Sequence, residues 1–208
     1  MPLFYQQHID PSTRLAIWKI EEPEDFFSLD IPLKKEITHP HKRLQHLAGR
    51  YLLPLLFPDF PNQEIEIADT RKPFLPGEQY HFSISHCANY AAAIVSNSKR
   101  VGIDVETINS KVEVIKHKFL HPEELDFIHL HNPVEQLKLL TLAWNAKEAM
   151  YKWYGLGQVD FSEMMRLDSF KLDNTGFIEA RFIKPDLEES LQVHYQFFEG
   201  LVLAWVFS

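Results

Sequence analysis

The stretch GIDVETI, residues 102–108, places two carboxylates, Asp104 and Glu106, two positions apart within a short apolar run. Successive residues of a β-strand point to opposite faces, so Ile103 and Val105 would share one face and the two acids the other. One interpretation is a half-exposed strand whose acidic face meets water. The alternative is half of a site for a hard cation, which requires oxygen ligands that converge from one direction. A third acid elsewhere in the chain would favour the second interpretation.

Strands and helices are predicted on both sides of this stretch. Short apolar or alternating runs bounded by turn residues indicate strands, which we expect at 3–9, 13–20, 80–85, 90–96, 101–106, 176–183, 191–198 and 201–208. Helical spacing of apolar residues, or acids around a proline, indicates helices, which we expect from 21 onward and over 41–56, 121–130 and 133–155. Pro54 should end or kink the helix over 41–56, because proline lacks the N–H that continues it.

Each half of the chain offers a helix-rich stretch followed by a closing pair of strands. Residues 80–96 and 193–208 match in pattern better than in identity. We therefore expect an α+β fold of two duplicated units related by a pseudo-two-fold axis, each with a small antiparallel sheet and packed helices. The predicted units are residues 1–102 and 103–208. The acidic strand would lie at their junction, a common place for ligands.

The composition and the N-terminal sequence indicate the cellular compartment of the protein. The 208 residues are 45% hydrophobic and 24% charged, as is usual for soluble globular proteins. The first ten residues lack a signal-peptide pattern, no run approaches the ~20 apolar residues that cross a bilayer, and the single cysteine, Cys87, cannot form an internal disulfide. These features predict a cytoplasmic protein without membrane contact.

Charge argues for a small anionic ligand. A net charge of −8 disfavours nucleic acid as a partner, because such binding neutralises many phosphates. Basic residues nevertheless gather in the first 72 positions, among them Lys34, Lys35, Lys42, Arg43, Arg50, Arg71 and Lys72. A local basic patch on an acidic protein suits a small anion better than a polymer, although scattered solvated side chains would give the same count.

The segment WNAKEAMYKWYG, residues 144–155, supplies a third acid within the predicted long helix. Trp144, Glu148 and Lys152 are spaced four apart and therefore lie along one stripe of that helix. A surface ion pair between Glu148 and Lys152 would explain their spacing and contribute about 0.3–0.5 kcal/mol. It would explain neither the tryptophan nor the two acids of the GIDVE strand. Trp144 would also serve to pack the helix against a sheet, since tryptophan buries a large area.

GIDVE and WNAKEAMYK, in this order, resemble the G-I-D-x-E and W-x-x-K-E-x-x-x-K signature pair of the 4′-phosphopantetheinyl transferases. The length and duplication resemble the Sfp-type branch of that family rather than its half-length, trimeric holo-acyl-carrier-protein synthases. Upstream, FSISHC is similar to the family's F-x-I-S-H segment, and RLQHLAGRYLL resembles its N-terminal nucleotide-binding helix. RKPFLPG resembles the G-K-P-x-x stretch, with Arg71 where glycine is usual, and KFLHPEEL resembles the F-x-x-x-E segment. After the signature helix, GLG resembles the family's G-x-G loop.

The resemblance implies a reaction. An enzyme of this kind transfers 4′-phosphopantetheine from coenzyme A to a serine of an apo-acyl or peptidyl carrier protein, releases 3′,5′-ADP and uses Mg²⁺. The resemblance assigns the metal to Asp104, Glu106 and Glu148. These residue types suit the chemistry, because Mg²⁺ takes one or two carboxylates plus substrate phosphates, and phosphoryl transfer depends mostly on positioning and charge neutralisation.

The resemblance also distributes roles among other polar residues. Glu148 would be the base for the serine, directly or through a water, with Glu124 as the competing choice, and Lys152 would neutralise the transferring phosphate. Lys72 matches the family's 3′-phosphate lysine. His86 would donate a hydrogen bond to the pyrophosphate, although a lone histidine in a strand is more often structural. The remaining expected substrate contacts are Arg43, Arg50, Arg71, Ser85 and Lys147, and less closely Lys34 and Lys35.

Two other functions compete with this interpretation. A non-catalytic protein of the same fold could bind coenzyme A or a carrier domain, but binding alone would not need three acids and both signature lysines. A magnesium-dependent nucleotide hydrolase could use the same acids.

Overall fold

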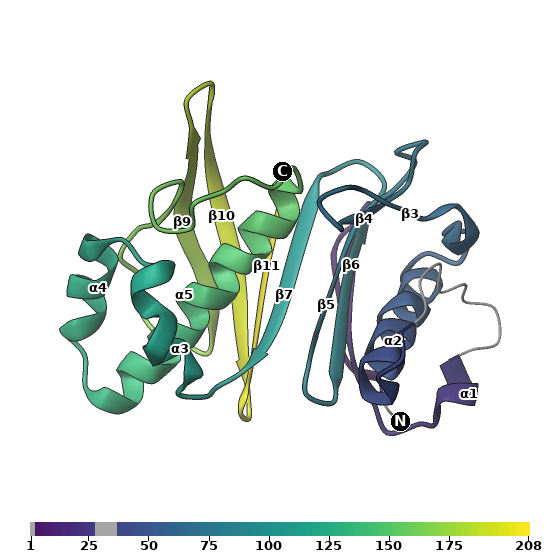
Figure 1. Ribbon diagram of the computed structural model, residues 1–208, viewed down its shortest axis with the longest axis horizontal. Helices are drawn as coiled ribbons and strands as arrows, with labels where there is room; N and C mark the ends of the chain where they lie inside the picture. The colour runs from purple at the N-terminus through teal and green to yellow at the C-terminus, as the bar shows by residue number, and fades with distance from the viewer. Residues whose placement is uncertain (1–2, 28–36) are drawn as a thin grey trace.

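Two antiparallel sheets pack against each other at the centre of the computed structural model, and helices cover their outer faces (Figure 1). The structure describes residues 3–27 and 37–208, so Lys34 and Lys35 lie outside the described residues. None of the helices in these ranges could span a bilayer. The architecture confirms the predicted α+β class with small antiparallel sheets and packed helices.

Strands from the N-terminal part of the chain form the first sheet. Their order is β1 (Leu3–Asp10), β2 (Thr13–Lys19), β6 (Tyr90–Ser96) and β5 (His81–Cys87). Helix α2 (Pro40–Leu56) crosses the outer face of this sheet, with the short helix α1 (Glu24–Phe27) beside it. A 3-10 turn, η2 (Asn62–Glu64), and a small hairpin, β3 (Glu66–Ile67) and β4 (Pro73–Phe74), connect α2 to β5.

The rest of the chain forms the second sheet. Its order is β7 (Val101–Thr107), β11 (Leu201–Phe207), β10 (Leu187–Phe198), β9 (Thr175–Lys184) and β8 (Met165–Leu167). The long helix α5 (Pro133–Tyr154) packs on β7 and β11, and α3 (Lys111–Ile115), η3 (Lys116–Lys118) and α4 (Pro122–His129) lie on the same side. The predicted boundary between residues 102 and 103 falls within β7 and stays a prediction.

Three buried apolar clusters hold these layers together. One lies between α2 and the first sheet, one between the second sheet and its helices, and one between the two sheets. The third cluster explains the alternation in the GIDVE strand, because Ile103 and Val105 are fully buried in it. Asp104 and Glu106 therefore point to the opposite face of β7, on which α5 packs.

Glycine at position 102 allows the close approach of α5 to β7. A Cβ added to Gly102 would lie 2.0 Å from the carbonyl oxygen of Ala149 and 2.6 Å from the backbone nitrogen of Trp153. Both atoms belong to the backbone of α5, which cannot move aside without moving the helix. Gly102 therefore sets the distance between the strand that carries two of the acids and the helix that carries the third.

Local sequence sets the ends of the two long helices. The side-chain oxygen of Asn132 accepts hydrogen bonds from the backbone N–H groups of Val134 and Glu135, which caps the start of α5. The helix ends at Gly155, whose φ of 76° is left-handed. Pro54 lies in the last turn of α2, and the carbonyl of Arg50, which loses its helical donor there, accepts instead from Asn62 at 3.5 Å.

Candidate functional site

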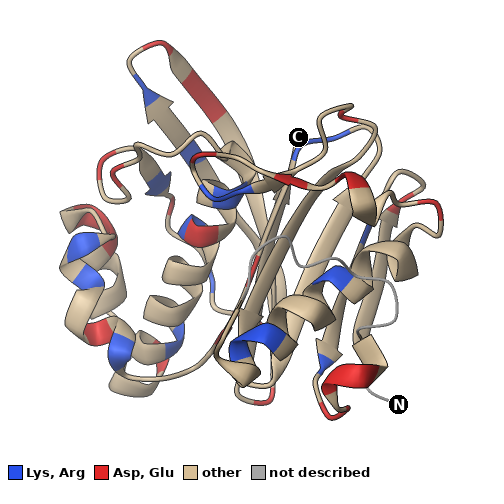
Figure 2. Ribbon diagram, turned by 45° about the vertical axis from the view of Figure 1, so that its right-hand side comes forward, with Lys and Arg blue, Asp and Glu red and all other residues tan. Residues whose placement is uncertain are grey.

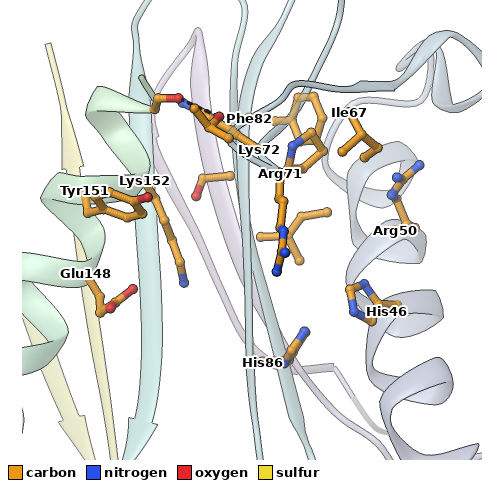
Figure 3. Close-up of a pocket in the computed structure, with 15 residues that line it drawn as sticks. His46, Arg50, Ile67, Arg71, Lys72, Phe82, His86, Glu148, Tyr151 and Lys152 are labelled. Atoms are coloured by element: carbon orange, nitrogen blue, oxygen red, sulfur yellow. Dashed lines mark hydrogen bonds between the residues drawn. The ribbon is translucent and has the colours of Figure 1, made fainter. Parts of the chain in front are cut away.

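Several predicted site residues converge on one cavity of about 310 Å³, which we call the central cavity (Figure 3). It lies between α2, β5 and the β3–β4 hairpin on one side and α5 on the other. The side chains predicted from the sequence that line it are Arg50, Arg71, Lys72, His86, Glu148 and Lys152. Residues far apart in the chain are thus brought together at the junction of the two sheets.

The acids of β7 lie beside this lining, where β7 meets β5 and α5. The Oδ1 atom of Asp104 accepts hydrogen bonds from Lys152 Nζ at 2.5 Å and from Ser85 Oγ at 2.6 Å. Ser85 Oγ also accepts from Lys152 Nζ at 2.9 Å, so the three side chains form one polar group. Glu106 Oε2 accepts a hydrogen bond from the Cys87 thiol at 3.0 Å.

Glu148 and Glu106 lie close enough to Asp104 for its negative charge to affect their protonation. Burial, and then the negative charge of Asp104, raises the pKa of Glu148 to about 7. The same two causes raise the pKa of Glu106. The carboxylates of Glu106 and Glu148 are therefore held in surroundings that disfavour their charged form, which a nearby cation would reverse.

The donor set fits a hard cation. Asp104 is 4% exposed, and its Oδ2 atom is buried without a hydrogen-bond partner among the described protein atoms. A buried carboxylate oxygen without a donor, facing further acids, favours a bound cation, and carboxylate oxygens are ligands that Mg²⁺ accepts. In the part of the chain that the structure describes, no three His, Cys, Asp or Glu side chains are already arranged as a metal site. The cation that contacts Asp104 in the structure is the ammonium group of Lys152.

Basic groups dominate the other side of the central cavity. Arg50 is 8% exposed, and Lys and Arg recur along α2, whereas α5 carries both acids and bases (Figure 2). Burial, aided by Arg100, lowers the pKa of Lys72 to about 8. Burial, and then His46, lowers the pKa of His86 to about 4, so its imidazole is neutral at pH 7 and can donate one hydrogen bond.

Glu124 and Lys147 lie elsewhere, in the packing between α4 and α5. Lys147 is fully buried and donates to Glu124 Oε2 at 2.6 Å and to the carbonyls of Phe119 and Phe161. Glu124 accepts in addition from the backbone N–H of Leu167 at 2.7 Å. The structure therefore joins these two residues to each other and, within the described ranges, leaves them out of the central cavity lining.

Arg43 and Trp144 also lie apart from the described lining of the central cavity. The guanidinium of Arg43 contacts the carboxylate of Glu24 on α1, with Nη2 at 2.8 Å from Oε2. The indole of Trp144 packs against Phe119 and Phe161, with ring centroids 5.1 Å and 5.8 Å away. Packing of α5 is thus the role that the geometry gives to Trp144.

Several lining residues were not predicted from the sequence, among them the two ring side chains His46 and Tyr151. The ring of His46 lies 4.9 Å from that of His86 in an edge-to-face contact. His46 precedes Arg50 by one helical turn, and Tyr151 follows Glu148 by three positions, so both share a helix face with a predicted residue. That spacing is the signal that could have identified them.

Comparison with known proteins agrees with this geometry. The family model described as 4′-phosphopantetheinyl transferase superfamily matches residues 100–206, which run from the start of β7 into β11 and make up just over half of the chain. The chain belongs to the 4′-phosphopantetheinyl transferase superfamily. The family resemblance inferred from the signature pair is thereby confirmed.

Curated relatives carry related names. The chain is 34% identical to enterobactin synthase component D of Salmonella austin over 115 residues, 53% of this chain and 47% of that protein. It is 30% identical to a 4′-phosphopantetheinyl transferase of Bacillus subtilis over 121 residues, 57% and 50% of the two chains. It is 30% identical to the 4′-phosphopantetheinyl transferase AcpT of Escherichia coli K12 over 129 residues, 59% and 64% of the two chains. The matched stretch spans about half the length of the first two relatives.

Proposed function

We propose that the protein transfers 4′-phosphopantetheine from coenzyme A to a serine of an apo-acyl or peptidyl carrier protein and releases 3′,5′-ADP. The observation that carries the proposal is the central cavity, where Glu148 and Lys152 face a basic side suited to phosphates. Family membership supports the same reaction, as do the names of the relatives from B. subtilis and E. coli. The two-part architecture favours the Sfp-type branch and a monomer.

The transfer requires the serine oxygen to attack the phosphorus next to the pantetheine arm while the bond to 3′,5′-ADP breaks. In our proposal Glu148 accepts the serine proton, directly or through a water. Lys152 neutralises charge on the transferring group, and Ser85 and Asp104 hold its ammonium in place. The competing base, Glu124, accepts hydrogen bonds from Lys147 and from the backbone N–H of Leu167. Its carboxylate is therefore already engaged, which favours Glu148 as the base.

Magnesium would be held by Asp104, Glu106 and Glu148. When bound there, it would stabilise the negative charge that develops on the pyrophosphate oxygens. His86 would donate to the pyrophosphate as a neutral imidazole, and Arg50 and Lys72 would bind the 3′-phosphate. The net charge of −8 and the single cysteine are consistent with a cytoplasmic enzyme that binds neither nucleic acid nor membranes.

Mass spectrometry of carrier proteins tests the proposal. The protein is incubated with coenzyme A, Mg²⁺ and a panel of apo-carriers, and one carrier is expected to gain a single phosphopantetheine with an equal amount of 3′,5′-ADP. A carrier with alanine at the acceptor serine and a reaction with EDTA are the controls. Binding of coenzyme A without modification of any carrier would indicate the non-catalytic alternative. Nucleotide release without carrier modification would indicate a hydrolase.

A further inference from the structure

Arg71 occupies a backbone position that favours glycine. In the β3–β4 hairpin its N–H donates to the carbonyl of Ala68 at 2.8 Å, which closes a β-turn, and the N–H of Ala68 donates to the carbonyl of Lys72 at 2.9 Å. Arg71 has a φ of 67°, in the left-handed region. A turn followed by a left-handed residue is a common hairpin connection, and that residue is usually glycine because a Cβ adds strain. The arginine is therefore present against the preference of the backbone.

The side chain of Arg71 points into the central cavity. Figure 3 shows its guanidinium directed from the hairpin toward the part of the cavity where Lys152 and His86 lie, and away from Arg50. Among the residues that the structure describes, no hydrogen bond or ion pair holds this guanidinium. Arg71 is exposed, so water solvates this guanidinium, and with the two lysines of the lining it forms a positive surface that favours an anionic ligand.

We infer that Arg71 binds the pyrophosphate bridge of the substrate, and that it does not belong with Arg50 and Lys72 at the 3′-phosphate. The inference rests on the proposed function and adds to it a residue peculiar to this chain. The left-handed backbone conformation and the unpaired guanidinium are two separate observations that a contact with the ligand would explain. A guanidinium suits this role because it offers two parallel N–H donors to phosphate oxygens, whereas lysine offers a point charge.

Three variants separate the charge of Arg71 from its backbone strain. R71G removes both, R71Q removes the charge and keeps the strain, and R71K keeps a charge without paired donors. Thermal unfolding of R71G should occur about 1–4 °C above that of R71Q, because glycine adopts the left-handed conformation without strain. Gln158→Gly is the matched control, since Gln158 has a φ of 52° and is exposed outside the described cavity lining. Gln158→Gly should leave ligand binding unchanged.

Calorimetry with coenzyme A and dephospho-coenzyme A, at fixed Mg²⁺ and salt, identifies the phosphate that Arg71 contacts. We expect R71G and R71Q to weaken both ligands by the same factor, about tenfold, and R71K to weaken them less. A loss confined to coenzyme A would place Arg71 at the 3′-phosphate, and unchanged affinities would show that it contacts neither ligand; either result overturns the inference. Failure of the proposed function is distinguishable, because it is measured as absent carrier modification by the wild-type protein, whereas the inference is measured as the ratio of variant to wild-type affinities.

Discussion

The charge of the Lys72 side chain depends on pH near neutrality. Burial and Arg100 lower the pKa of its ammonium to about 8, and His81 lies in the same surroundings. A bound phosphate favours the charged ammonium, so anion binding takes up a proton wherever the free Lys72 is neutral. The affinity for 3′,5′-ADP should therefore be nearly constant from about pH 7 to pH 8. Above pH 8 it should fall by up to about tenfold per pH unit.

Calorimetry over this range measures the effect, because the phosphates, with a second pKa near 6, stay fully ionised there. Lys72→Arg is the matched control, since a guanidinium remains charged throughout. Its affinity should be flat between pH 8 and pH 9.5. An equal decline in both proteins would contradict the assignment of the pH dependence to Lys72.

Substitution of Lys72 tests whether the basic side of the central cavity recognises the 3′-phosphate of coenzyme A. A hydrogen bond to a charged group contributes about 1.5–3 kcal/mol, so wild-type protein should bind coenzyme A roughly 10- to 100-fold more tightly than dephospho-coenzyme A. Lys72→Ala should remove much of this discrimination and affect dephospho-coenzyme A little. Two proteins titrated with two ligands at fixed salt complete the cycle. Equal weakening of both ligands would make Lys72 a structural residue.

At the scale of elements, the contact between β7 and α5 controls the geometry of the acids. Gly102→Ala would place a Cβ 2.0 Å from the carbonyl oxygen of Ala149, so α5 must shift. We expect a loss of about 1–3 kcal/mol in the free energy of unfolding, as for other overpacked sites, together with a large loss of turnover because Glu148 moves with the helix. Chemical denaturation and the carrier assay measure the two effects.

Gly200→Ala is the control for this prediction. Gly200 is left-handed, with a φ of 74°, and no atom lies within 4 Å of an added Cβ. Its substitution should cost stability through backbone strain and leave turnover per folded molecule unchanged. If Gly102→Ala retained wild-type turnover, the strand-to-helix distance would not matter for the site.

The packing of α4 on α5 depends on a buried ion pair. Lys147 is 0% exposed and Glu124 7% exposed, so Lys147→Met would leave a buried carboxylate without its cation. We expect a loss of about 3–5 kcal/mol in the free energy of unfolding, measured by denaturant titration. The double variant Lys147→Met with Glu124→Gln should recover part of this loss, because the unpaired charge is removed. Stability that is unaffected by Lys147→Met, with turnover abolished, would instead favour a catalytic role for this pair.

At the scale of the whole molecule, sequence periodicity predicted the main features of the fold. Alternation in GIDVE predicted that Ile103 and Val105 would be buried together and the acids would face the other way, because strand geometry is local. The stripe of Glu148 and Lys152 on α5 was predictable for the same reason. Lys152 in fact pairs with Asp104 on β7, the strand against which α5 packs, and not with its helical neighbour Glu148.

Partners distant in the chain were harder to predict. The sequence suggested substrate contacts for Arg43 and Lys147, but the fold brings Glu24 to the first and Glu124 to the second. Such pairings depend on how helices pack, which no local spacing encodes. His46 was missed because its contact with His86 arises only where α2 crosses β5.

The two halves of the molecule contribute opposite sides of one site, and we propose that the acids at their junction act through Mg²⁺. The most direct test is the initial rate of carrier modification as a function of Mg²⁺ for wild type, Asp104→Ala and Asp168→Ala. Asp168 is an exposed carboxylate near Arg181, away from the central cavity, and serves as the control. We predict a Mg²⁺-dependent rate for wild type and Asp168→Ala, and a rate about a hundredfold or more lower for Asp104→Ala at limiting Mg²⁺. A near-normal rate for Asp104→Ala at limiting Mg²⁺ would show that the acids do not act through the metal.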